Sequence, residues 1–214
     1  MGQYHYTVNL DKREFLNPYK LGDGLKLYEQ INSPGGVPSA LFILLACSNG
    51  RGGGDFNFDT YEFVGEKCYR MPREGCEDLL ELATRWVGHW AGDRVAVVGD
   101  YAELDDLRPG DDADVIYDLC HPETERKECI AHYRKVAAEA REKGGQLYGR
   151  SVEKYEDKAD RLEKAKPFTD ITDDILPLVE AICEVEITGD GWRDKKTKGT
   201  APRMCPDMVV TVQR

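Results

Sequence analysis

The first residues of the chain alternate apolar and polar side chains, which predicts a half-buried strand over residues 3–10. Phe15 and Leu16 then predict the return strand of a hairpin. This strand ends at Asn17-Pro18, because the residue before a proline is steered away from helical backbone angles. The N-terminus is therefore expected to contribute two neighbouring strands to a sheet.

The run Arg94 to Val98 is short and apolar on both parities, and Gly-Asp pairs bracket it on each side. This pattern is typical of a strand that is buried on both faces, so we expect it at the centre of the sheet. Asp93 and Asp100 stand at its two ends. They either make ordinary turns or, held by the rigid sheet, reach solvent and take part in chemistry.

Helical periodicity is clearest over residues 76–90, where apolar side chains recur at i, i+3, i+4 and i+7. Trp86 and Trp90 lie on that apolar stripe and are expected in the core, with a stacking platform for a ligand as the alternative. Residues 38–47 are apolar almost all round. They predict a buried helix, with a buried strand as the alternative at this length.

The second half of the chain is rich in charged helices. Residues 122–143 predict one helix, and Ser151 is expected to cap another that runs to about Lys166. The two would form a helical hairpin over 122–166 that projects from the sheet. Its narrow apolar seam and dense mixed charge fit either a solvated face or a surface that binds a protein partner.

Shorter signals complete the pattern. Asp23 or Gly24 is expected to cap a short helix that ends near Ile31, and Asp174 a helix through Cys183 with Pro177 in its first turn. Further short strands are predicted at 61–64, 115–117, 185–187 and 208–212. The whole chain, residues 1–214, is thus expected to be a single α+β domain with a mixed, largely antiparallel sheet flanked by helices.

The 214-residue chain carries a formal net charge of -11, which argues against general binding of nucleic acid or of an anionic membrane surface. It has no apolar run of the ~20 residues that a membrane span needs and no secretory leader pattern, so a cytoplasmic protein is expected. Seven dispersed cysteines without a Cys-x-x-Cys pair read as reduced thiols. Neither Cys120-His121 nor the acidic stretch 103–114 matches a metal motif, and no metal ligands or cofactor are assigned.

The glycine-rich loop at 48–56 is the best candidate for ligand binding. Gly52, Gly53 and Gly54 let the backbone approach a ligand closely, and successive peptide N–H groups there can bind an anion beside Arg51. The loop lacks the Lys-Ser/Thr ending of a phosphate-binding P-loop and the spacing of a dinucleotide fingerprint. A purely structural loop is the alternative.

Four stretches, MGQY at the N-terminus, GDGLKL at 22–27, SNGRGGGDF at 48–56 and WAGDRVAVVGDYAE at 90–103, resemble a family of small uncharacterised proteins from phages, prophages and bacteria. The resemblance covers roughly the first half of the chain. It implies a compact cytoplasmic accessory protein and brings no activity or cofactor.

These observations favour a protein that binds a small anionic ligand such as a nucleotide or phosphate ester. The candidate ligand-binding residues are Arg51, Gly52, Gly53, Gly54, Asp55, Trp90, Asp93, Asp100 and Tyr101. If the protein is an enzyme, metal-assisted hydrolysis fits these carboxylates best. The alternatives are an acidic interaction module that modulates a host factor through the helices at 122–166, without catalysis, and a structural accessory protein.

Overall fold

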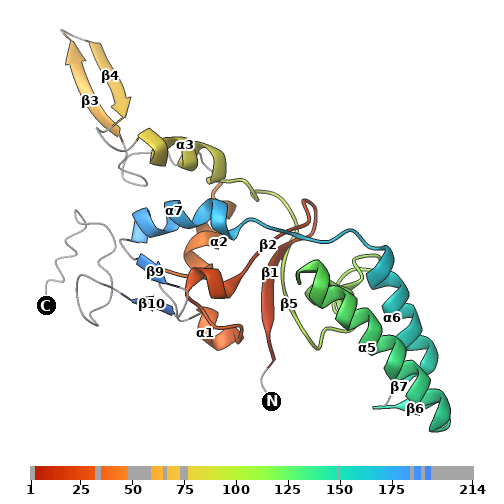
Figure 1. Cartoon of the computed structure of the whole chain (residues 1–214). Helices are drawn as coiled ribbons and strands as arrows, with labels where there is room; N and C mark the ends of the chain where they lie inside the picture. Colours follow the sequence, from red (N-terminus) through yellow and green to blue (C-terminus); the bar gives the residue numbers. More distant parts are fainter. Residues whose placement is uncertain are drawn as a thin grey trace, which may run out of the picture. The chain divides into compact units, whose positions relative to one another are not determined.

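A computed structural model describes residues 3–31, 35–47, 59–64, 67–72, 77–148, 150–183, 186–188 and 191–193 (Figure 1). The chain divides into two compact units, which are described separately. One comprises Met1–Phe15 and Ala96–Asp170, and the other comprises Leu16–Val95 and Ile171–Arg214. The single domain expected over 1–214 stays a prediction.

The first unit contains a four-stranded mixed sheet, which with the helices confirms the α+β class. Its strand order is β5-β1-β2-β8, and β2 runs parallel to β8. The strands span β1 His5–Asn9, β2 Glu14–Leu16, β5 Val95–Gly99 and β8 Thr169–Asp170. β1 and β2 are neighbours, as the predicted hairpin requires. The predicted half-burial of β1 is wrong, because Thr7 and Asn9 on its expected polar face are 1% and 0% exposed. The Asn9 side chain holds the turn between them, since its Oδ1 accepts hydrogen bonds from the backbone N–H groups of Asp11 and Lys12.

The predicted central position of the strand at 94–98 is wrong. β5 lies at one edge of the sheet, and the side chain of Val97 in its middle is 47% exposed. Val98 at its end is buried. A five-residue apolar run satisfies the pattern of a doubly buried strand, but only its neighbours in space decide how many of its faces are covered.

The strand predicted at 115–117 is also wrong, because these residues belong to helix α4, Ala113–Leu119. Nearly every side chain of α4 is buried. A short helix that is buried all round shows no amphipathic period, so its apolar run cannot be told from a strand.

The predicted helical hairpin is confirmed as α5, Glu123–Glu142, and α6, Val152–Lys164, which lie side by side (Figure 1). The Ser151 side chain caps α6 by accepting a hydrogen bond from the N–H of Lys154. The two-residue strands β6, Gln146–Leu147, and β7, Arg150–Ser151, pair where the helices are joined. The buried seam between the helices consists of Val136, Ala137, Ala140, Val152 and Tyr155.

The second unit is built on an apolar core in which Trp86 and Trp90 are both buried, as predicted. Its helical segments are η1 Pro18–Leu21, α1 Leu27–Ile31, α2 Val37–Leu45, α3 Glu77–Trp86 and α7 Thr172–Cys183. The buried helix predicted at 38–47 is thus confirmed as α2. Helix α3 ends before Trp90, because the chain turns at Gly88 with a φ of +78°.

Two predicted helix starts in this unit need correction. Asp23 does not cap α1, which begins at Leu27; instead its Oδ2 accepts a 2.8 Å hydrogen bond from the N–H of Val37, at the start of α2. Helix α7 begins at Thr172, so Pro177 lies inside the helix rather than in its first turn. Burial of Thr172 and Ile175 in the core outweighs the weak local signal of Asp174.

Two antiparallel pairs of strands complete the second unit. They are β3 Asp59–Val64 with β4 Lys67–Pro72, and β9 Glu186–Thr188 with β10 Gly191–Arg193. β3 and β9 match predicted strands, whereas the strand predicted at 208–212 lies outside the described residues. Among the described helices, none combines the length and apolar character required to cross a bilayer.

Candidate functional site

Three potential metal ligands converge in the first unit, at the corner between α4 and α5. Asp118 lies in the last turn of α4, His121 in the link, and Cys129 in α5. One carboxylate oxygen, one imidazole nitrogen and the Cys129 sulfur all lie within 4.8 Å of one another. Asp118 is buried, and the other two residues are half-buried. This cluster is the only one of its kind within the described part of the chain.

Local helix geometry produces the cluster. The N–H of His121 donates a 3.2 Å hydrogen bond to the backbone oxygen of Asp118, so one further turn follows the end of α4. Pro122 has an extended ψ of 156° and starts α5 in a new direction. Cys129 lies about two turns into α5, which returns its side chain toward the corner.

Two further side chains hold the Asp118 carboxylate. The Tyr133 hydroxyl donates a 2.7 Å hydrogen bond to Oδ2, and the Lys158 ammonium lies 3.6 Å from the same oxygen. The Lys158 nitrogen also lies 4.6 Å from the centre of the Tyr133 ring, a cation–π distance. Lys158 comes from α6 and is 6% exposed. All three helices of this unit therefore contribute to one polar cluster.

Burial and the negative charge of Asp118 change the acidity of the neighbouring groups. Desolvation, followed by the charge of Asp118, raises the pKa of Cys129 to about 11. The same two causes raise the pKa of Tyr133 above its usual range. At neutral pH Cys129 is therefore a protonated thiol, which argues against an activated cysteine nucleophile at this corner.

The His121 ring is held by aromatic neighbours. It makes edge contacts with Tyr6 and Tyr117, with ring centres 6.0 and 5.0 Å away. Its Nδ1 is buried and has no hydrogen-bond partner. A buried imidazole nitrogen without a partner is costly, and coordination of a metal is one way to satisfy such an atom.

Four of the nine residues predicted from sequence belong to the described part of the chain, and none of these four lies in this cluster. Residues 51–55, from Arg51 to Asp55, lie outside the described residues. Trp90 is fully buried in the core of the second unit, where Asp93 is half-buried. Asp100 belongs to the first unit, where its Oδ1 accepts a hydrogen bond from the N–H of Tyr4. Tyr101 follows it and is 54% exposed. The convergence of these residues on one ligand stays a prediction.

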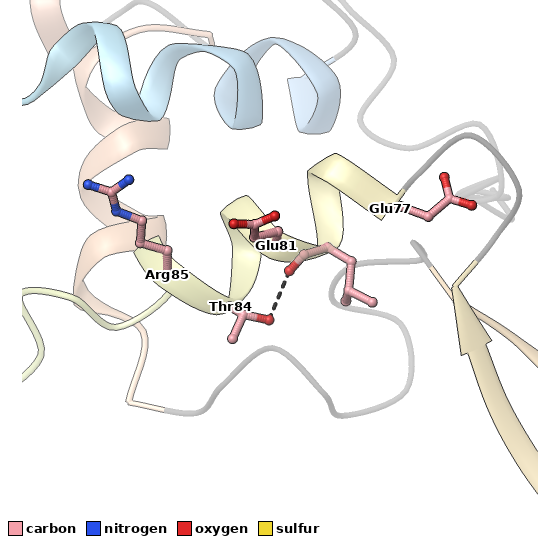
Figure 2. A pocket seen from close by; sticks show the side chains of 5 residues that line it. Glu77, Glu81, Thr84 and Arg85 are labelled. Atoms are coloured by element: carbon pink, nitrogen blue, oxygen red, sulfur yellow. Dashed lines mark hydrogen bonds between the residues drawn. The ribbon is translucent and has the colours of Figure 1, made fainter.

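The depression along α3 offers little chemistry. Figure 2 shows that its lining side chains come from this single helix, and the hydroxyl of Thr84 is already bonded to the backbone oxygen of Leu80 at 2.8 Å. The other lining residues are Glu77, Glu81 and Arg85. A surface formed by one helix does not enclose a ligand.

The sequence places Cys120 next to His121, whereas in the structure Cys129 is the cysteine that joins His121 in the cluster. Cys120, its neighbour in sequence, is 5% exposed, and burial raises the pKa of its thiol. Two features of the sequence indicate this cluster. Asp118 and His121 are three residues apart across the end of a helix, and Cys129 lies two turns into the next helix. The contribution of Lys158 carries no local signal, because it depends on the packing of α6.

The chain matches no protein-family model, and neither a curated protein nor a solved structure is significantly similar to it.

Proposed function

We propose that the protein binds a divalent transition metal of the zinc class through Asp118, His121 and Cys129. The observation that carries the proposal is the convergence of a carboxylate oxygen, an imidazole nitrogen and a sulfur within 4.8 Å. These are the three donor types that zinc uses in proteins. The bound ion would displace the thiol proton of Cys129 to solvent. Imidazole and the resulting thiolate together favour zinc-class ions over magnesium or calcium, which prefer oxygen ligands.

A zinc ion with three protein ligands keeps one position for water or for an external group, as catalytic zinc sites do. Such a position offers a way to hold the small anionic ligand expected from the sequence. If the protein is an enzyme, this arrangement supports metal-assisted hydrolysis, because a bound zinc lowers the pKa of its water.

The test is isothermal titration of the reduced, metal-stripped full chain with Zn²⁺. We expect one ion per chain that is lost on addition of a chelator. If a binding free energy of roughly 10 kcal/mol is shared by three ligands, each contributes about 3 kcal/mol. Each of Asp118→Asn, His121→Ala and Cys129→Ser should then weaken binding by about a hundredfold.

Matched controls on the same chain make the result specific. His132→Ala removes an exposed imidazole of α5, and Cys47→Ser removes an exposed thiol. Neither should change the affinity for zinc. Titration with Co²⁺ should also give a sulfur-to-metal absorption band that Cys129→Ser abolishes. The proposal would be refuted by an absence of binding, or by binding that survives both His121→Ala and Cys129→Ser.

A further inference from the structure

We infer that Tyr133 determines which ions the cluster prefers and that Lys158 limits its affinity for every cation, an inference that rests on the proposed metal function. Tyr133 engages one oxygen of Asp118, and Lys158 balances the charge of that carboxylate. As a result, the affinity of the cluster for an ion comes from the imidazole nitrogen and the sulfur more than from the charge of the carboxylate. Neither residue has to touch the ion.

The two carboxylate oxygens of Asp118 are not equivalent. Oδ2 already accepts the 2.7 Å hydrogen bond from Tyr133 and faces the Lys158 ammonium at 3.6 Å. Because Oδ2 is engaged in this way, Asp118 is expected to bind a metal through one oxygen rather than through both. Zinc accepts a single oxygen within a tetrahedral set. Calcium needs six to eight oxygen ligands and gains from bidentate carboxylates, so this arrangement disfavours it.

Asp118 and Lys158 form a buried pair of opposite charges. The positive charge of Lys158 balances the negative charge of Asp118, both side chains being 10% exposed or less. A hard cation, which is bound mainly by negative charge, therefore gains little from a carboxylate whose charge Lys158 balances. An ion that bonds strongly to imidazole and sulfur would still bind at the cluster.

Lys158 and Tyr133 are held in place by each other and by the packing of α6 on α5. The ammonium of Lys158 lies 4.6 Å from the centre of the Tyr133 ring, so the two residues support each other as well as Asp118. Lys158 projects from α6, which packs along α5 through the buried Val136 and Tyr155. An incoming ion therefore meets a fixed positive charge rather than one that swings into solvent.

The experiment compares Zn²⁺ with Mn²⁺, which prefers oxygen ligands and can be followed by electron paramagnetic resonance. Tyr133→Phe frees Oδ2, so it should raise Mn²⁺ affinity relative to Zn²⁺ by about tenfold, the scale of a lost outer contact at a metal site. Lys158→Met keeps the buried stem but removes the charge. It should strengthen the binding of both ions by about tenfold or more.

Two variants serve as matched controls. Tyr155→Phe removes a buried hydroxyl of α6 that donates to the backbone oxygen of Leu147, and Lys164→Met removes an exposed ammonium from the end of the same helix. Both should leave the two affinities unchanged. Far-ultraviolet circular dichroism confirms folding, and if Lys158→Met unfolds, Tyr133→Phe decides the question alone.

The outcomes separate the two proposals. If the wild-type chain does not bind Zn²⁺, the proposed function fails and this inference fails with it. If the wild type binds Zn²⁺ tightly, only this inference is overturned by either of two results: Tyr133→Phe leaves the Zn²⁺ to Mn²⁺ affinity ratio unchanged, or a folded Lys158→Met weakens the binding of both ions or changes neither.

Discussion

The Arg161 side chain should make one of the largest single ionic contributions to the stability of the first unit. Its guanidinium donates two hydrogen bonds to the Asp114 carboxylate, at 2.7 and 2.8 Å, and a third to Asp157 at 2.8 Å. The bond to Asp114 joins α6 to the first turn of α4. The side chains of Arg161 and Asp114 are only 22% and 13% exposed, so solvent weakens this pair little.

The expected cost of Arg161→Met follows from these contacts. Hydrogen bonds to a charged group contribute about 1.5–3 kcal/mol each, and the pair to Asp114 shares one carboxylate. We therefore expect a loss of about 3 kcal/mol, within the range for breaking a buried ion pair. With a urea dependence of about 2 kcal/mol per molar, the midpoint of unfolding should fall by about 1.5 M.

The measurement is urea unfolding followed by far-ultraviolet circular dichroism, combined in a double-mutant cycle with Asp114→Asn. A coupling energy of about 2 kcal/mol is expected because the two side chains are in direct contact. Arg134→Met is the matched control, since its bond to Glu163 joins two half-exposed side chains and should cost about 0.5 kcal/mol or less. The reasoning is wrong if Arg161→Met costs no more than this control, or if the double mutant is additive.

Two further predictions concern a glycine and the cysteines. Gly88→Ala should destabilise the second unit by a few kcal/mol, because its Cβ would lie 2.5 Å from a backbone oxygen at the end of α2. Gly110 has a similar positive φ but open space around it, so Gly110→Ala should cost about 1 kcal/mol. Equal midpoints of thermal unfolding for the two variants would contradict this difference. Iodoacetamide at pH 8, read by peptide mass spectrometry, should label the exposed Cys47 well before the buried Cys120 and the half-buried Cys129. Desolvation raises the pKa of both of the latter thiols, and the thiolate is the reactive form. Labelling of Cys129 should accelerate as the pH approaches 11, and early labelling at pH 8 would show that the thiol is not desolvated.

The elements that sequence predicted well carry long periodic patterns and clear end signals. The α5–α6 hairpin is the best example, because an apolar stripe sets each helix and the Ser151 cap marks the start of α6. In these two helices local preference and tertiary packing agree, so the pattern alone is sufficient. β1 was predicted as a strand, but the alternation misjudged its burial, because Thr7 and Asn9 on the expected polar face are as buried as Val8.

The errors fall where burial comes from distant parts of the chain. Helix α4 reads as a strand because its neighbours cover it on nearly every side, and β5 reads as central although Val97 is half-exposed. The candidate site was missed for the same reason, because its residues are brought together by tertiary packing. Cys120 is closer to His121 in sequence than Cys129 is, but the turn at Pro122 determines which thiol reaches the imidazole.

The three proposed ligands have a consequence for how the chain folds, because all of them lie within residues 118–129. Closing so short a segment around an ion costs little entropy, so the unfolded chain can already hold zinc, although less tightly than the folded chain does. Equilibrium stabilisation by the metal should therefore be smaller than its affinity for the native state implies. The metal is expected to affect the rate of folding more than the equilibrium stability. A bound ion would form the α4–α5 corner before α6 packs against it and brings Lys158 to Asp118.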